Sequence, residues 1–422
     1  MKGELTLIDY SKFVMNNGLT VIHHHDEHTQ LCVLNLLYKV GSKDENPNKT
    51  GFAHLFEHLM FGGSINIPEF DTPLQFAGGE NNAFTSNDIT NYYLTLPSSN
   101  IETGFWLESD RMLSLDFNQK SLDVQKGVVI EEFKERYLNQ PYGDLWLHIL
   151  PLAYQKHPYN WPTIGKEISH IENANLEDVK DFFKNFYAPN NGILVVAGNI
   201  SLEKTKDLCE KWFGDIPAQN IQKSNYEQEP KQSEARRKII QSDVPANLIL
   251  KAYHMGGRLD KNYYAMDLLS DIIGSGKAST LYDVLVKEKA LFSEIDAYIS
   301  GDAEPGLFMI EGKLLPGISI EDAEKGILDV IDDLHAKGIS ETELKKVQNK
   351  TETNIRFGDV NILNRAMKLA YAEYLGDIEL VNKEIEMYLE IDTQYMLSQI
   401  RETLQESNCS TIIYQAINHD NQ

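Results

Sequence analysis

The residues with the clearest chemical potential are His54, Glu57 and His58, which lie within the run 50–63. If this run is a helix, positions i, i+3 and i+4 share one face, so the two imidazoles and the carboxylate point the same way. Two imidazoles one turn apart can bind a tetrahedral Zn²⁺, and a carboxylate between them can take a proton from the metal-bound water. The three residues are therefore candidates for two zinc ligands and a general base.

The spacing H-x-x-E-H is the inverted form of the zinc-peptidase motif, so a zinc site built on it would be of the inverzincin type. Gly62 and Gly63 follow the run and are typical of a helix end. The same letters also fit an amphipathic core helix with two hydrogen-bonded histidines and a solvated glutamate. A third ligand is needed to decide between the two interpretations.

Candidates for that ligand occur in a second helical stretch, 122–138, where Glu131 and Glu132 adjoin the apolar turn 128–130. Two carboxylates beside so apolar a turn are unusual unless one of them has a function. One of the pair is the natural third ligand.

A separate histidine cluster, 23–28, also invites a metal interpretation. On a strand only His23 and His25 converge, because successive side chains alternate between faces. Nothing nearby supplies a third ligand. We therefore expect a solvated strand end there.

Composition limits the class of protein. A chain of 422 residues suggests two to three domains, and 42% hydrophobic with 24% charged residues is typical of a soluble globular protein. No apolar run reaches the ~20 residues needed to span a bilayer, so no membrane association is expected. Three well-separated cysteines suggest buried thiols. Because no signal peptide is visible, we expect a cytoplasmic location; a leader that had been removed would allow the periplasm.

The formal net charge of −24 argues against nucleic acid as a partner, because phosphate neutralisation requires basic patches. The acidic balance favours basic partners or substrates, or is simply a soluble acidic surface.

Strands and helices interleave along the chain. Segments 13–22 and 80–96 have the pattern of hairpins, 31–40 and 192–199 of apolar strands, and 69–76, 101–115, 176–187 and 202–213 of helices. If the first strand of 80–96 lies at a sheet edge, it could accept an extended peptide as an added strand. An ordinary hairpin explains the same pattern. Frequent hairpins indicate an α+β fold with largely antiparallel sheets flanked by helices.

The second half of the chain repeats the order of the first. Strand 246–253 and helix 263–273 match 31–40 and the motif helix, which places Met266, Leu269 and Ser270 where His54, Glu57 and His58 stand. We therefore expect two homologous domains, 1–217 with the metal site and 237–422 without one, joined by the polar linker 218–236.

Several segments together resemble the M16 (pitrilysin/insulinase) family of metallopeptidases, in its short two-domain form, similar to the mitochondrial processing peptidase and its bacterial relatives. The segments are Val40–Glu45, Gly51–Phe61, Asn82–Thr85, Glu108–Met112, Val128–Glu132 and Tyr187–Asn191. The resemblance covers nearly the whole chain. It implies the LuxS/MPP-like metallohydrolase fold, with one Zn²⁺ per chain in the first half only.

The resemblance also implies roles for particular residues. His54 and His58 would be zinc ligands, Glu57 the base, and Glu132 the third ligand, since the family uses the second glutamate of such a pair. The family usually has another glutamate seven residues earlier, and here that position is Gln125. The peptide would be held as an added strand by Asn82, Ala83 and Phe84.

In the family the second half often supplies an Arg and, seven residues on, a Tyr that stabilise the substrate carbonyl. Here these positions are Val286 and Ser293, which cannot do so. The implied function is a zinc endopeptidase acting on unstructured peptides, as the catalytic subunit of a heterodimer whose homologous partner supplies the Arg-Tyr pair, or else as a homodimer. The alternative is a non-catalytic peptide-binding or assembly subunit that retains zinc.

Overall fold

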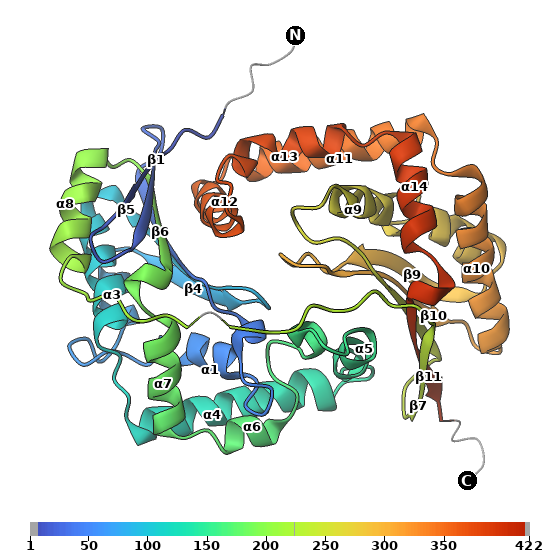
Figure 1. The fold of residues 1–422 in the computed structure, drawn as a ribbon, viewed down its shortest axis with the longest axis horizontal. Helices are drawn as coiled ribbons and strands as arrows, with labels where there is room; N and C mark the ends of the chain where they lie inside the picture. Colours follow the sequence, from blue (N-terminus) through green and yellow to red (C-terminus); the bar gives the residue numbers. More distant parts are fainter. Residues whose placement is uncertain (1–6, 223, 418–422) are drawn as a thin grey trace. The chain divides into compact units, whose positions relative to one another are not determined.

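The computed structural model describes residues 7–222 and 224–417, and they form two compact units (Figure 1). Unit 1 comprises Met1–Phe133, Trp161–Asn225 and Ile355–Lys383, and unit 2 comprises Lys134–Asn160, Tyr226–Asn354 and Glu384–Gln422. Residues 1–6 and 418–422 of the expected domains, and Lys223 of the expected linker, lie outside the described residues.

Unit 1 is built on a six-stranded sheet in the order β1-β2-β6-β3-β5-β4. Its strands are β1 (Ser11–Val14), β2 (Thr20–His25), β3 (Leu31–Tyr38), β4 (Glu80–Thr85), β5 (Thr90–Pro97) and β6 (Gly192–Gly198). Every pairing is antiparallel except that of β2 with β6. Strand β4 is therefore an edge strand.

Both faces of this sheet are buried, which explains why β3 and β6 are almost continuously apolar. Val33 and Leu37 pack on α12 (Ile362–Leu375) in one hydrophobic core, and α3 (Ile101–Leu113) packs on the other face against β3 and β5. Gly104 allows α3 to approach closely, because a Cβ there would lie 2.8 Å from the Leu94 side chain.

The remaining helices of unit 1 are α1 (Phe52–Leu59), α2 (Asp71–Phe76), α4 (Gln119–Phe133), α6 (Ile168–Glu172), α7 (Leu176–Phe186) and α8 (Leu202–Phe213). Polar residues begin the last two of them. Asn175 accepts hydrogen bonds from two backbone N–H groups at the start of α7, and Ser201 does the same for one at the start of α8.

Unit 2 repeats the topology of unit 1 with five strands in the order β7-β11-β8-β10-β9. They are β7 (Arg236–Ser242), β8 (Leu248–His254), β9 (Phe292–Ile299), β10 (Leu307–Leu314) and β11 (Cys409–Ala416). Strand β7 pairs in parallel with β11, as β2 does with β6. Its helices include α5 (Leu145–Ala153), α9 (Lys261–Gly274), α10 (Ile320–Lys337) and α14 (Thr393–Thr403); α11 (Glu341–Gly358) and α13 (Leu380–Leu389) carry the chain from one unit to the other.

One hydrogen-bond pattern marks the repeat at the level of side chains. The Asn191 amide donates to the carbonyl oxygens of Lys39 and Phe186. The Asn408 amide donates in the same way to those of His254 and Thr403. Lys39 and His254 thus occupy equivalent positions in the two units, in agreement with the sequence match of the two halves.

The predicted α+β class with largely antiparallel, helix-flanked sheets is confirmed. However, each half contributes a covering helix to the other unit: α12 packs on the sheet of unit 1, and α5 packs on the sheet of unit 2. The compact units therefore do not end at residues 217 and 237, because each unit contains a segment from the other half of the chain. As bounds of the internal repeat, 217 and 237 stay a prediction.

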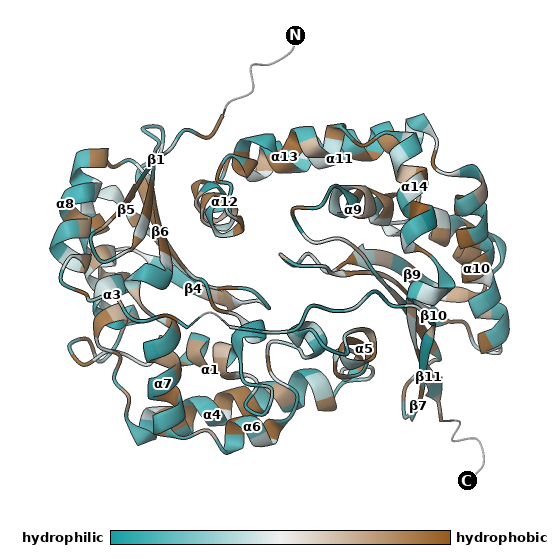
Figure 2. Cartoon of the chain, in the orientation of Figure 1, coloured by the Kyte–Doolittle hydropathy of each residue, from teal (hydrophilic) through white to brown (hydrophobic). Residues whose placement is uncertain are grey.

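Hydropathy follows this architecture (Figure 2). Hydrophilic and hydrophobic residues alternate around helices such as α8 and α10, as expected of helices that cover a sheet with one face. Among residues 7–222 and 224–417, no helix combines the length and the hydropathy needed to cross a bilayer.

Candidate metal centre

Helix α1, which carries the histidine motif, is fixed at its start by a buried carboxylate. Gly51 precedes the helix with a left-handed φ of 88°, a conformation that glycine adopts readily. The Glu45 carboxylate accepts the N–H groups of Gly51 at 2.9 Å and Ala53 at 2.8 Å, and the indole N–H of Trp161 at 3.1 Å. Glu45 therefore satisfies backbone donors that the first turn of α1 would otherwise leave without partners.

Burial raises the pKa of Glu45 to about 8, although its three N–H donors act in the opposite direction. No pattern in the sequence assigns a role to Glu45. The only signal available in the sequence was its place six residues before the glycine that starts α1.

His54, His58 and Glu132 converge on one point. Glu132 Oε2 lies 3.7 Å from His54 Nε2 and 3.5 Å from His58 Nε2, because α4 packs across α1. The potential ligand atoms of all three residues lie within 4.8 Å of one another, and this is the only such group of three or more His, Cys, Asp or Glu residues among those described. All three side chains are partly exposed, so the point is open to solvent.

These distances suit zinc. Around a tetrahedral Zn²⁺ with bonds of about 2.0–2.1 Å, neighbouring ligand atoms stand roughly 3.3–3.5 Å apart. Two imidazoles and one carboxylate are also a donor set that zinc accepts in catalytic sites, where a fourth position stays open for water. The residues present therefore fit the metal that the motif predicts.

Glu57 stands beside this group on α1 and is held by a neighbouring strand. Thr85, the last residue of β4, donates its hydroxyl to Glu57 Oε2 at 2.6 Å. Burial raises the pKa of Tyr92 and of Tyr187 above the usual range, and the nearby Glu57 carboxylate acts in the same direction. Glu57 thus has a defined hydrogen-bond donor at one oxygen and neutral phenols in its surroundings.

A buried ion pair between Arg111 and Glu108 contacts aromatic residues near α1. The Arg111 guanidinium donates to both Glu108 oxygens at 2.6 and 2.8 Å, and it lies 4.5 Å from the ring centres of Phe70 and Tyr92. Both charged side chains are almost fully buried. The pair therefore joins α3 to the aromatic residues around α1 and β5.

The two adjacent glutamates of α4, Glu131 and Glu132, differ in exposure. Glu131 is exposed, whereas Glu132 is half-buried in the metal group. Gln125 lies two helical turns before Glu132, so it stands near the same face of α4.

Asn82, Ala83 and Phe84 lie on β4, which is an edge strand of the sheet. Phe84 is exposed, and the Ala83 N–H donates to the Asn82 side chain at 2.8 Å. Strand β4 also packs on α1. The strand and the motif helix are thus neighbours within unit 1.

Two positions named from the resemblance belong to unit 2. Val286 lies in a π-helix (Tyr282–Glu288), and Ser293 on β9 donates its hydroxyl to the Lys313 carbonyl. The counterparts of the metal residues on α9 are buried: Met266 and Leu269 lie in the core, and Ser270 donates to the Asp267 carbonyl. The helix of unit 2 that corresponds to α1 thus has none of the motif's ligands.

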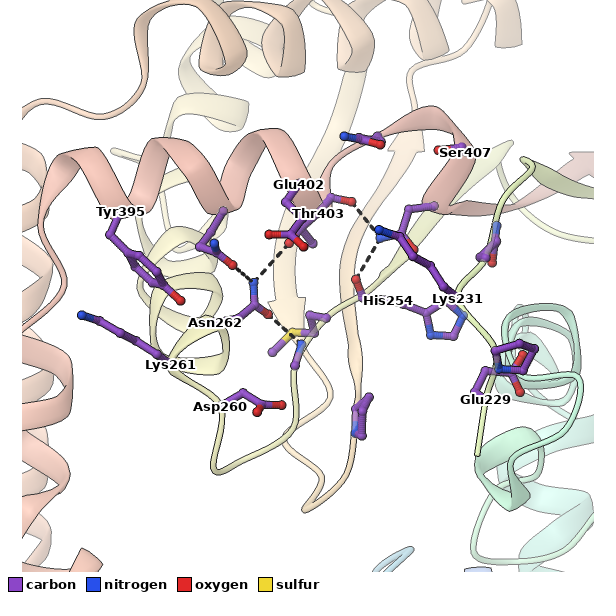
Figure 3. Close-up of a pocket in the computed structure, with 18 residues that line it drawn as sticks. Glu229, Lys231, His254, Asp260, Lys261, Asn262, Tyr395, Glu402, Thr403 and Ser407 are labelled. Atoms are coloured by element: carbon purple, nitrogen blue, oxygen red, sulfur yellow. Dashed lines mark hydrogen bonds between the residues drawn. The ribbon is translucent and has the colours of Figure 1, made fainter. Parts of the chain in front are cut away.

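A pocket of about 600 Å³ in unit 2 lies between the start of α9 and the end of α14 (Figure 3). Its polar groups pair with one another: the Asn262 side chain bonds the Gly256 N–H, Gln399 and Thr403. No metal-ligand group of the described residues lies there. The described residues of this pocket therefore provide no alternative metal centre.

The histidine cluster of β2 is structural, and the expectation of a solvated strand end was wrong for two of its members. His23 and His24 are buried. His23 and His25 both hydrogen-bond the Ile200 carbonyl at 2.9 Å, and a ring nitrogen of His24 bonds the Asp9 carbonyl. Strand β2 lies inside the sheet between β1 and β6, and its side chains are covered because α8 and α12 pack against it.

Comparison with known proteins identifies the family of this two-unit fold. The model of the insulinase family, Peptidase family M16, matches residues 20–167, and that of the Peptidase M16 inactive domain matches 173–351. The chain belongs to the M16 peptidase family.

Three relatives illustrate the likeness. The zinc protease PqqE of Helicobacter pylori is 28% identical over 98% of this chain and 94% of its own length. A crystal structure of a protease from Helicobacter pylori superposes with a TM-score of 0.91 at 28% identity, covering 97% of this chain and all of that one. The probable mitochondrial-processing peptidase subunit beta of Schizosaccharomyces pombe is 28% identical over 48% of this chain and 44% of its own length.

Proposed function

We propose that this chain is a zinc-dependent endopeptidase that hydrolyses unstructured peptides, with His54, His58 and Glu132 as the ligands of one Zn²⁺ and Glu57 as the general base. The observation that carries the proposal is the convergence of three ligand residues: Glu132 Oε2 lies 3.7 Å from His54 Nε2 and 3.5 Å from His58 Nε2, and the ligand atoms of all three lie within 4.8 Å of one another. The Glu57 carboxylate is on the same helix as the two histidines. The relative named a zinc protease over nearly the same length supports the choice of metal.

A bound zinc ion would polarise the scissile carbonyl and lower the pKa of a coordinated water toward about 7. The protein's own part is proton transfer and orientation. Glu57 takes the proton of the attacking water and later gives it to the leaving amine. The Thr85 hydroxyl donates to that carboxylate, and the phenols of Tyr92 and Tyr187 are near enough to interact with it electrostatically.

The substrate would bind as an extended strand along β4. An edge strand offers main-chain donors and acceptors to any sequence, so this mode is tolerant of side chains but requires an unfolded segment. Asn82, Ala83 and Phe84 are the contacts we assign, with Phe84 exposed for apolar side chains. Folded proteins would be poor substrates, since their backbone is already paired.

The test is hydrolysis of an unstructured peptide that carries a fluorophore and a quencher. Activity should disappear when zinc is removed with a chelator and return when zinc is added back. A folded protein containing the same peptide sequence should resist cleavage. Activity that is indifferent to the chelator would contradict the proposal.

We further propose that the active form is a heterodimer in which this chain is the catalytic subunit. Val286 and Ser293 stand where the family resemblance implies an Arg-Tyr pair for the developing oxyanion, and the loss of such donors commonly costs ~10²–10³ in rate. The relative named as a processing-peptidase subunit supports a division of labour between chains.

The partner would be a second M16 chain that has the Arg-Tyr pair. Mass in solution and peptide turnover should be measured for the chain alone and after the partner is added. We expect weak turnover alone and a rise of at least about a hundredfold on addition. Full turnover by a monomer or homodimer would contradict the heterodimer. Zinc binding without turnover in either state would favour a non-catalytic peptide-binding subunit.

A further inference from the structure

Thr85 is the residue through which the edge strand contacts the general base. Its hydroxyl donates to Glu57 Oε2 at 2.6 Å. Along β4 the exposed residues alternate with half-buried ones, so Asn82 and Phe84 share one face while Ala83 and Thr85 share the other. The second face is the one directed to α1, where Thr85 meets Glu57.

The acceptor of the Thr85 hydroxyl differs from the one that a strand threonine commonly uses. A threonine in a strand commonly satisfies its hydroxyl on a nearby backbone carbonyl, as Thr90 does with the Val40 carbonyl at 2.9 Å. Thr85 instead donates to a carboxylate, and hydrogen bonds to charged acceptors are shorter and stronger than neutral ones. The bond therefore fixes a flexible side chain and not merely the strand end.

Fixing the side chain matters because a glutamate has three rotatable bonds. A carboxylate that must meet a water molecule at hydrogen-bond distance loses rate when it samples other rotamers. A donor on Oε2 restricts rotation about the last bond and so narrows the orientations that the carboxylate samples.

We propose that Thr85 is a positioning residue for Glu57: its hydroxyl holds Oε2 and so fixes the carboxylate in the orientation from which it takes the proton of the attacking water. This inference rests on the proposed function of Glu57 as base. This hydrogen bond also joins β4, the strand that we assign to substrate binding, to the base Glu57. It therefore fixes the position of the base relative to that strand.

Two substitutions separate this role from packing. Thr85→Val keeps the shape of the side chain and removes the hydroxyl, whereas Thr85→Ser keeps the hydroxyl and removes the methyl. We expect kcat to fall roughly tenfold to a hundredfold in Thr85→Val, with KM within about twofold, and to stay near the wild-type value in Thr85→Ser. Zinc content should be unchanged in both variants.

A matched control is available on the same hairpin. Thr95 on β5 is half-buried like Thr85 but lies opposite Glu80, at the other end of the pairing. Thr95→Val should leave kcat unchanged. All variants should be assayed in the oligomeric form in which the wild-type chain hydrolyses peptide, whether or not that form includes a partner chain.

A second readout does not depend on turnover. In the metal-free protein, the free energies of unfolding of Thr85→Val, Glu57→Ala and the double variant form a cycle that measures the coupling of the two side chains. We expect the two single effects to be non-additive. Additive effects would overturn the inference, because they mean that the hydrogen bond does not persist in solution.

The kinetic outcomes are equally decisive. Loss of kcat in Thr85→Ser with none in Thr85→Val would assign the residue to packing, and a rise in KM alone would assign it to the substrate strand; either overturns the inference. Wild-type protein without turnover in any assembly refutes the proposed function and this inference with it. Turnover that Thr85→Val retains refutes this inference alone.

Discussion

Glu132 Oε2 lies 3.5 Å from His58 Nε2, which brings the end of α4 against the histidine motif of α1. The neighbouring Glu131 points elsewhere and is exposed, because adjacent residues on a helix are about 100° apart. The two carboxylates thus differ in the structure, whereas the local sequence pattern leaves them equivalent and only the family resemblance favours Glu132.

The pair of variants Glu132→Gln and Glu131→Gln tests this assignment. Metal analysis after gel filtration should give near one zinc per chain for the wild type and for Glu131→Gln, and close to none for Glu132→Gln, since a neutral amide is a weak ligand. The reverse pattern would show that the other glutamate binds the metal.

Binding of the substrate as an added strand predicts a periodic effect of backbone methylation. A strand at a sheet edge uses the N–H of every second residue. Peptides methylated at single amide nitrogens should therefore show a raised KM at alternating positions and little change at those between. A uniform effect at all positions would argue against pairing with β4.

The buried Arg111–Glu108 pair predicts a large effect on stability. Arg111→Met should lower the free energy of unfolding by about 3–5 kcal/mol, because it leaves the Glu108 charge buried without its partner. The exposed pair Lys211–Glu102 is the control, and Lys211→Met should change stability far less.

Replacing both partners, as in Glu108→Leu with Arg111→Met, should recover much of the stability lost in Arg111→Met. Urea unfolding measures all four proteins. A single Arg111→Met variant as stable as the wild type would mean that the pair is not a determinant of stability.

Glu45 predicts a pH dependence. Burial raises the pKa of Glu45 to about 8 in the folded protein from an ordinary value of 4.5. The folded state therefore holds a proton that the unfolded chain releases, so this stabilising contribution is complete below about pH 4.5 and is lost as pH rises through about 8.

Unfolding of the zinc-free protein should be measured between pH 5 and 8. The wild type should lose stability relative to Glu45→Gln, which cannot titrate, by an amount on the order of a few kcal/mol. Parallel pH profiles of the two proteins would show that Glu45 does not change its proton on unfolding.

Local patterns were sufficient for much of this architecture. The helical spacing of His54, Glu57 and His58 predicted α1, and the alternation around Asn82 and Phe84 predicted the hairpin of β4 and β5. These features depend on residues close together in the chain, where the periods of helix and strand are directly visible.

Contacts between distant segments could not be predicted in this way. Glu45 and Thr85 act on α1 through hydrogen bonds that no spacing encodes. The exchange of α5 and α12 between units depends on which sheet face each amphipathic helix covers, and hydropathy alone does not specify the partner of a helix. His23 was misjudged for the same reason, because the carbonyl of Ile200 that binds it is remote in sequence.

The proposed mechanism requires that Glu57 transfers protons and does not bind the metal. Its most direct test is to measure zinc content and peptide turnover together in Glu57→Gln, with Glu131→Gln as the control that should retain both. We expect near one zinc per chain in Glu57→Gln and turnover lowered by ~10²–10⁴. Wild-type turnover in that variant, or loss of its zinc, would show that Glu57 is not the general base.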